Sequence, residues 1–137
     1  MTNLVEKVLL TGLGLIIMMI FLTTIIPGLN SFLLSYNAYL SKFEECNTFI
    51  DEIDYGVNFL ILNSNSTYQN KVLYPKNMNF TLFEHVITYY YIIKNKKYNL
   101  EKKYPVQFYA LKYENISPGW HNLSIYYTFN HIKIDIL

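Results

Sequence analysis

The sequence predicts an α+β protein, in which a long N-terminal helix, first hydrophobic and then amphipathic, precedes a small antiparallel β-sandwich. Three observations support this fold class. The chain opens with an uncharged apolar run, continues with apolar residues at helical spacing, and ends in short β-rich runs separated by turn residues. We therefore expect two parts, a helix over residues 1–56 and a β-sandwich domain over residues 57–137.

The composition argues against several classes of function. The chain is 52% hydrophobic and 18% aromatic, while only 15% of its residues are charged, against about 25% in an average soluble domain. The formal net charge is +1, there is no arginine, and five of the eleven lysines lie within residues 94–103. A nucleic-acid-binding protein needs a basic face, so we expect no nucleic-acid partner.

The first element is a helix able to cross a membrane. No charged residue lies between Lys7 and Lys42, and residues 8–26 form an apolar run close to the roughly 20 residues that span the hydrocarbon layer. A signal peptide has a shorter apolar stretch of about 7–15 residues and ends at a small-residue cleavage site. We therefore expect a membrane anchor rather than a cleaved leader, with a kink or frayed turn at Pro27 and Gly28.

The side of the membrane that holds the C-terminal domain is suggested by four glycosylation patterns. Asn65, Asn79, Asn115 and Asn122 each begin an Asn-x-Ser/Thr pattern, and all four follow the apolar run. The acidic residues within 44–54 also fit an outer side poor in lysine and arginine. We expect an exterior domain with these four acceptor candidates. The alternative is that Asn and Thr simply populate turns and strand edges.

After the Pro-Gly pair, large apolar residues recur at spacings built from three and four. They are Leu29, Phe32, Leu33, Tyr36, Leu40, Phe43, Ile50, Ile53 and Val57, here called the apolar stripe. This spacing predicts an amphipathic helix of about 25 residues. Two interpretations remain open: the stripe docks on the chain's own β domain, or it packs partly there and partly on neighbouring copies. Cys46, the only cysteine, is expected to be a buried small hydrophobe, with an interchain disulfide as the alternative.

The rest of the chain predicts seven short strands, the number expected of a sandwich or barrel. The strands are predicted at "VNFLIL", "KVLY", "NFTLFE", "VITYYYIIK", "VQFYALKY", "HNLSIYYTF" and "HIKIDI". The segments "NSNST", "PKN", "KNKK" and "NISPG" are predicted as the loops between them. In the last strand, Ile132, Ile134 and Ile136 alternate with polar residues, so one face is expected to meet solvent.

The chain has 14 tyrosines, and their positions raise a question of binding. In a strand, Tyr90 points to the face opposite Tyr89 and Tyr91, so both faces of the sheet carry aromatic surface. One interpretation is an aromatic face that binds carbohydrate or another subunit, in which case replacing Tyr89 and Tyr91 should abolish binding. The favoured interpretation is that most tyrosines fill the core, because Tyr is a good strand former.

The sequence predicts no catalytic or metal site. His85, His121 and His131 are isolated from one another, and none has a partner at a familiar metal-ligand spacing. There is no glycine-rich phosphate loop and no nucleophile elbow, and the chain has only five glycines. We therefore expect no enzyme activity, no cofactor and no metal.

The order of these parts resembles the subunits of archaeal type IV filaments. An apolar helix that contains a proline, an amphipathic continuation and a small β domain occur together in archaellins, adhesive pilins and membrane-anchored archaellum accessory proteins. In that family a glutamate is commonly the fifth residue of the mature chain, and Glu6 is the fifth residue of "TNLVEKVLL" once Met1 is removed. "ISPGWHNLSIYY" is also similar to the last hairpin of immunoglobulin-like archaeal exodomains. The resemblance implies a pilin-like or Ig-like sandwich and assembly through the helix.

From the stripe and the resemblance together we expect a structural cell-surface subunit, located in the membrane with an exterior domain or in an extracellular filament of identical or related copies. The residues expected to carry assembly are Glu6, Pro27, Phe32, Leu33, Tyr36, Leu40, Phe43, Ile50 and Ile53. The alternatives are a monomeric membrane-tethered module that binds carbohydrate or a surface-layer protein, and a membrane protein of an archaeal virus.

Overall fold

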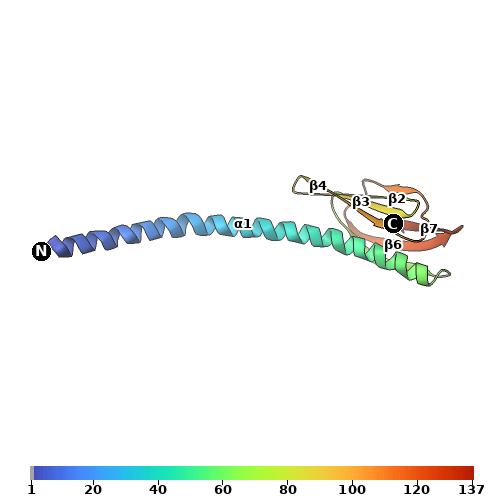
Figure 1. Cartoon of the computed structure of the whole chain (residues 1–137), viewed down its shortest axis with the longest axis horizontal. Coiled ribbons are helices and arrows are strands. Elements are labelled where there is room, and N and C mark those ends of the chain that lie inside the picture. Colours follow the sequence, from blue (N-terminus) through green and yellow to red (C-terminus); the bar gives the residue numbers. More distant parts are fainter. Residues whose placement is uncertain (1) are drawn as a thin grey trace. The chain divides into compact units, whose positions relative to one another are not determined.

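The computed structural model describes residues 2–137 and consists of one long helix followed by seven strands (Figure 1). The elements are α1 (Thr2–Leu62), β1 (Thr67–Tyr74), β2 (Met78–Phe83), β3 (Val86–Ile93), β4 (Lys96–Lys103), β5 (Leu111–Tyr113), β6 (Gly119–Thr128) and β7 (His131–Ile136). The predicted α+β class, a long N-terminal helix followed by antiparallel β structure, is confirmed.

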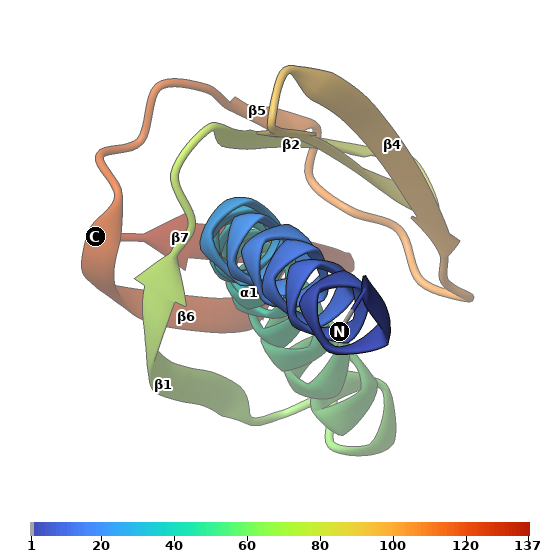
Figure 2. The same ribbon diagram turned by 90° about the vertical axis from the view of Figure 1, so that its left-hand side faces the viewer.

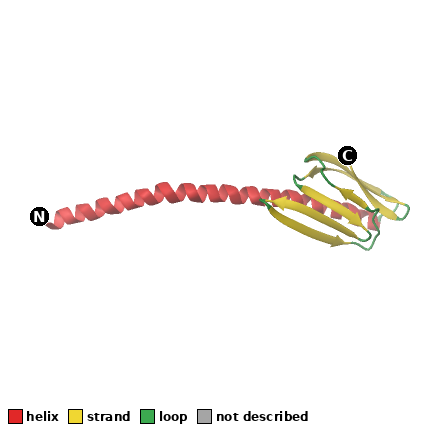
Figure 3. Ribbon diagram, turned by 90° about the horizontal axis from the view of Figure 1, so that it is seen from above, coloured by secondary structure: helices red, strands yellow, loops and turns green. Residues whose placement is uncertain are grey.

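The strands form two antiparallel sheets (Figure 3). The first, sheet A, has the order β1-β6-β7, and the second, sheet B, has the order β4-β3-β2-β5. Two hairpins close through two-residue turns with positive φ at both positions: Lys94 (48°) with Asn95 (63°), and Phe129 (48°) with Asn130 (68°). Such turns match the right-handed twist of the paired strands, and they make the hairpin tips narrow.

The C-terminal part of α1 is the centre of the hydrophobic core, with one sheet on each side of it (Figure 2). The Phe49 ring lies 5.0 Å from Tyr74 of sheet A and 5.9 Å from Phe80 of sheet B, measured between ring centroids. The other buried side chains of this helical segment are Cys46, Ile50, Ile53, Val57 and Leu60. The helix thus contributes a middle layer that the predicted two-layer sandwich did not include.

The chain divides into two compact units, residues 1–38 and residues 39–137. We refer to them as the N-terminal unit and the C-terminal unit. The sequence placed the division at residue 56, between the helix and the first strand, whereas the last turns of α1 belong to the C-terminal unit. The reason is burial, because the helix residues from Cys46 to Leu60 that face the sheets have almost no exposed surface.

One predicted strand is part of the helix, one is much shorter than predicted, since only Leu111–Tyr113 of "VQFYALKY" forms β5, and one observed strand was not predicted. The run "VNFLIL" (57–62) is the last part of α1, since Val57 and Leu60 lie three residues apart on the buried face of the helix. A short apolar run without alternation fits either a strand or a buried helix. In contrast, residues 96–103, expected to begin as a loop, form β4, which pairs along its length with β3. Its lysines suit an edge strand, where charge opposes pairing with other chains.

The predicted fraying at Pro27 and Gly28 does not occur, because α1 is helical through both residues. Pro27 has no N–H to donate, yet the helix is retained on both sides of it. Thr23 and Thr24, one turn before the proline, donate their hydroxyls to the carbonyls of Met19 (2.8 Å) and Ile20 (2.6 Å). In an apolar surrounding, unwinding would leave more backbone groups unpaired than the proline alone does.

Candidate assembly and binding surfaces

The N-terminal unit carries an uninterrupted apolar surface. Every large apolar side chain within residues 4–36 is exposed in the single chain. An 18-residue window of this helix has a mean hydropathy of 2.5, and none of that window is buried. By length and composition, α1 is therefore able to cross a membrane.

Hydroxyl side chains of this surface bond to the helix that carries them. Thr11 Oγ1 donates to the carbonyl of Lys7 at 2.6 Å, and Ser31 Oγ donates to the carbonyl of Gly28 at 2.9 Å. Such bonds give a hydroxyl a partner without water or a second chain. These hydroxyls can accordingly lie in hydrocarbon or against another apolar helix.

The first group of expected assembly residues is exposed. Glu6 is exposed near the start of α1, and Phe32, Leu33 and Tyr36 have 67%, 52% and 49% of their surface exposed. The rings of Phe32 and Tyr36 stack with centroids 6.4 Å apart. Pro27 lies in the same exposed helical segment. These side chains are all available to a neighbouring molecule or to lipid.

The remaining stripe residues pass from exposed to buried within five turns of helix. Leu40 is 38% exposed, Phe43 is half-buried against Tyr91 and Tyr98, and Ile50 and Ile53 are 2% and 0% exposed. Ile50 and Ile53 thus have no exposed surface for another copy. Residues 43–57 of the stripe therefore dock on the chain's own sheets, whereas residues 29–40 remain exposed, and packing of this second part on neighbouring copies stays a prediction.

Cys46 is a buried small hydrophobe, as expected. Its side chain is 3% exposed and lies in the core between the sheets. Burial, with a smaller contribution from Glu45, raises the pKa of its thiol to about 11. A thiol with this pKa is almost entirely protonated near neutral pH and is therefore unreactive.

A groove lies beside α1 on the side of β1 and the start of β6, and we call it the acidic groove. It has a volume of about 420 Å³ and is lined by Ser41, Glu44, Glu45, Thr48, Phe49, Glu52, Lys71, Val72, Leu73 and Trp120. Trp120 is 64% exposed, and Lys71 Nζ lies 6.0 Å from the centroid of its ring. Glu52 is held in place by hydrogen bonds from Tyr68 and Asn70, whereas Glu44 and Glu45 are exposed at the rim.

A second cavity, of about 590 Å³, lies among the β2–β3 turn, residues 107–110 and the β6–β7 turn. Three exposed aromatic side chains line it: Phe83 (63%), Tyr109 (52%) and Phe129 (94%). Glu84, Gln107 and His131 add polar groups to its wall. Exposed aromatic rings beside hydrogen-bonding groups are a combination able to bind an amphipathic ligand.

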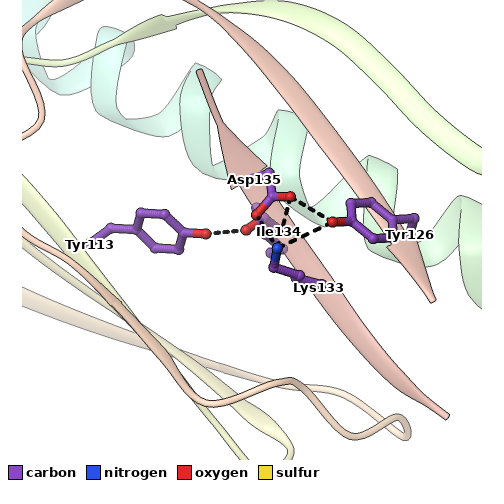
Figure 4. A network of polar contacts seen from close by, with 5 residues as sticks. All are labelled: Tyr113, Tyr126, Lys133, Ile134 and Asp135. Atoms are coloured by element: carbon purple, nitrogen blue, oxygen red, sulfur yellow. Dashed lines mark hydrogen bonds and ion pairs between the residues drawn. The ribbon is translucent and has the colours of Figure 1, made fainter. Parts of the chain in front are cut away.

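The outer face of sheet A carries a polar network (Figure 4). Tyr126 donates to Asp135 Oδ2 at 2.6 Å, and Lys133 Nζ donates to the same oxygen at 3.1 Å. Hydrogen bonds to Asp135 and then Tyr126 raise the pKa of Lys133. Tyr113 donates to the backbone carbonyl of Ile134 and thereby joins sheet B to sheet A. This network is a structural contact between strands, and the predicted alternation of "HIKIDI" is confirmed.

The histidines bind backbone rather than one another. His85 Nδ1 lies 2.9 Å from the carbonyl of Val106, His121 Nε2 lies 2.8 Å from that of Ser117, and His131 Nδ1 lies 2.9 Å from that of Phe129. A carbonyl only accepts, so each of these nitrogens donates. Within residues 2–137, no group of three or more His, Cys, Asp or Glu side chains is placed to hold a metal ion.

Three of the four acceptor asparagines, Asn65, Asn115 and Asn122, are exposed. Asn79 is half-buried on β2, and its Oδ1 accepts a hydrogen bond from the backbone N–H of Asn115 at 3.4 Å. All four patterns lie in the C-terminal unit.

The tyrosine predictions have mixed outcomes. Tyr90 is 45% exposed, whereas Tyr89 and Tyr91 are 0% and 6% exposed. The alternation is therefore confirmed, but Tyr89 and Tyr91 are core residues and do not form a binding face. Other exposed aromatic side chains lie at the two cavities, Trp120 at the acidic groove and Phe129 at the second cavity, and no sequence pattern singled them out.

Comparison with protein-family models, characterised proteins and solved structures found no match to this chain. The function is therefore inferred from the surfaces of the chain itself.

Proposed function

We propose that this protein is a structural cell-surface subunit, pilin-like in organisation, that is anchored in the membrane by residues 8–26 and assembles with other copies through α1. The observation that carries the proposal is the contrast along one helix. Large apolar side chains are uniformly exposed within residues 4–36, whereas those of residues 46–60 that face the sheets are buried in the chain's own core. A surface of that kind needs cover from lipid or from other helices.

The distribution of charge supports both kinds of cover. Residues 8–41 carry no charge, so this part of α1 has no strongly polar face that would require contact with water on one side. Such a helix is stable in hydrocarbon, and it is equally stable when similar helices surround it. The proposal therefore includes an inserted state in the membrane and an assembled state in a filament, with the C-terminal unit outside.

Glu6 has a specific role in this proposal. It lies at the start of the apolar run, beside Lys7, and its side chain is exposed. A carboxylate transferred into an apolar bundle is costly unless a cation pairs with it. In an assembled filament, Glu6 pairs with a cationic group of a neighbouring copy, such as a terminal amine or Lys7. The side chains of Phe32, Leu33, Tyr36 and Leu40 supply apolar contact farther along the helix.

A membrane-tethered binding module is the second candidate, and the aromatic cavity favours it. Phe83, Tyr109 and Phe129 expose large ring surfaces around a space of about 590 Å³. Sugars offer apolar C–H faces to such rings and hydroxyls to groups such as Glu84 and Gln107. This function uses α1 only as an anchor, so it predicts activity without assembly.

The test is mass spectrometry of the N-terminal peptide from sheared surface filaments and, in parallel, from the remaining membranes. The proposal expects the chain to be abundant in the sheared fraction. It also expects Glu6→Ala to abolish assembly with normal membrane insertion, while Glu101→Ala, which removes an exposed carboxylate of β4, leaves assembly unchanged. Confinement of the wild-type chain to the membrane would exclude the filament function and leave the tethered module.

A further inference from the structure

The C-terminal unit carries a basic surface that complements its acidic groove. The two-residue turn Lys94-Asn95 and the following Lys96 and Lys97 form what we call the basic hairpin, at the tip of the β3–β4 hairpin. In Figure 1 this hairpin extends beyond the other strands of its sheet. Lys96 and Lys97 are both exposed, and Lys96 Nζ lies 5.5 Å from the centroid of the Tyr98 ring. A tip with a two-residue turn is narrow enough to approach a groove.

The acidic groove and the basic hairpin lie on opposite sides of α1. The hydroxyl of Tyr39 lies 2.9 Å from that of Tyr98 on β4, so position 39 faces the basic hairpin. Thr48 lines the acidic groove and lies nine residues later (48 − 39). At about 3.6 residues per turn, nine residues are roughly two and a half turns, which puts the two positions on opposite faces. Within one chain the groove at Thr48 therefore opens away from the hairpin, whereas Glu45, which also lies beside Ile92 and Ile93, borders the groove on its hairpin side.

We propose that the basic hairpin of one copy docks in the acidic groove of the next copy. This inference rests on the proposed function, because it names the contact through which the C-terminal units associate. The incoming ammonium groups meet the carboxylates of Glu44 and Glu45 and the exposed ring of Trp120. The indole face already accommodates one ammonium group, that of Lys71 at 6.0 Å. Opposite charges placed in this way favour one orientation and disfavour others.

A second copy is the favoured occupant because every copy brings both halves of the contact. A contact between two different patches is heterologous, and it repeats in one direction from copy to copy. Patches on opposite sides of α1 leave each docked copy with a free groove on one side and a free hairpin on the other. The result is a continuing row of copies rather than a closed pair. This is the geometry that a filament requires.

The first experiment is a charge exchange in the full-length chain, expressed in its own cells and scored by the fraction of subunit in sheared filaments. Glu44→Lys with Glu45→Lys is expected to lower that fraction roughly tenfold or more, because it places like charges against the hairpin. Lys96→Glu with Lys97→Glu is expected to do the same. A chain that carries all four substitutions is expected to regain assembly. Lys103→Glu, a charge reversal of the same kind at the other end of β4, is the control for each single reversal and should have no effect.

The second experiment detects the contact without requiring filaments. Membranes containing chains with Glu44→Cys and Lys97→Cys are oxidised and analysed on a non-reducing gel. Each single variant can link two chains at most, whereas the double variant is expected to give a ladder of dimers, trimers and larger species. Cys46 is buried and does not contribute to the ladder.

The outcomes separate the two proposals. A ladder without filaments supports the contact and overturns the filament function. Filaments that tolerate both charge reversals, with no ladder, overturn the contact and keep the filament function. Loss of assembly on reversal of the groove alone, with the hairpin reversal tolerated, also overturns the contact and assigns the groove to a different basic partner. Recovery in the fourfold variant supports the contact and shows that the reversed chains fold.

Discussion

The assignment of the last turns of α1 to the core is tested by Ile53→Ala. Ile53 is 0% exposed and belongs to the cluster formed by the helix and both sheets. The substitution removes three side-chain carbons, and at ~0.8 kcal/mol for each buried carbon the lost transfer free energy is about 2.4 kcal/mol. The cavity left behind adds to this, because neighbouring side chains relax only in part. The expected loss in the free energy of unfolding is therefore about 2–5 kcal/mol.

The matched control is Leu33→Ala, which removes a similar volume from the same helix where the side chain is 52% exposed. We expect it to change the free energy of unfolding of the C-terminal unit by less than about 0.5 kcal/mol. The assay is equilibrium urea unfolding of the detergent-solubilised full chain, followed by near-ultraviolet circular dichroism of the buried tyrosines. If Ile53→Ala were as stable as wild type, or Leu33→Ala equally destabilised, the helix would not be the middle layer of the domain.

Three further predictions concern the C-terminal unit. Gly56→Ala should destabilise the fold by about 1 kcal/mol even after the gain in helix propensity, since the new Cβ would lie 2.6 Å from two side-chain carbons. Gly28→Ala, where a new Cβ would meet nothing within 4 Å, is the control, and thermal melting compares the two variants. Phe129→Asn should raise the free energy of unfolding by about 0.5–1 kcal/mol, because φ is 48° at this exposed turn position; an unchanged urea midpoint would contradict this. The stability should also fall in alkali: burial raises the pKa of Cys46 from 9.0 to about 11 and that of Tyr68, with help from Glu52, from 10.0 to about 12. Because the folded pKa of each group exceeds its unfolded pKa, the two protonated groups favour the folded state, and this contribution to the free energy of unfolding is complete below about pH 9 and is lost as the pH rises towards 12. Urea unfolding across that pH range, together with tyrosinate absorbance, measures this contribution, and a free energy of unfolding that does not change with pH would refute it.

The fold class was predictable because its signals are local. The charge-free run, the three-and-four spacing of the stripe and the alternation in residues 131–136 each depend on neighbours in the sequence. The end of α1 was not predictable in the same way. Residues 57–62 suit a strand or a helix by composition, and the contact that decides between them is made with residues such as Ile125, which are distant in the sequence. Tertiary packing therefore determined the boundary.

The candidate surfaces were predictable only in part, for the same reason. Residues 8–36 were recognisable as an apolar surface from sequence, since no other segment was needed to define it. The acidic groove needs α1 and β6 to meet, and Trp120 is separated from Glu44 by most of the C-terminal unit in sequence. The buried Tyr89 and Tyr91 show the opposite error, in which a conspicuous local pattern belongs to the core.

The two parts of α1 differ in the placement of charge more than in apolar content. Both contain Ile and Phe, but residues 8–41 lack charge on every side, whereas residues 42–54 carry Glu44, Glu45 and Glu52 on the side away from sheet B. The acidic side lets one face of the helix meet water while the other lies in the core, so a single domain can cover it. The charge-free part has no charged face, and the large apolar side chains that it exposes within residues 4–36 need cover. A membrane supplies that cover to one copy, and a filament supplies it only when several copies contribute, which links the burial of α1 directly to the number of subunits that assemble.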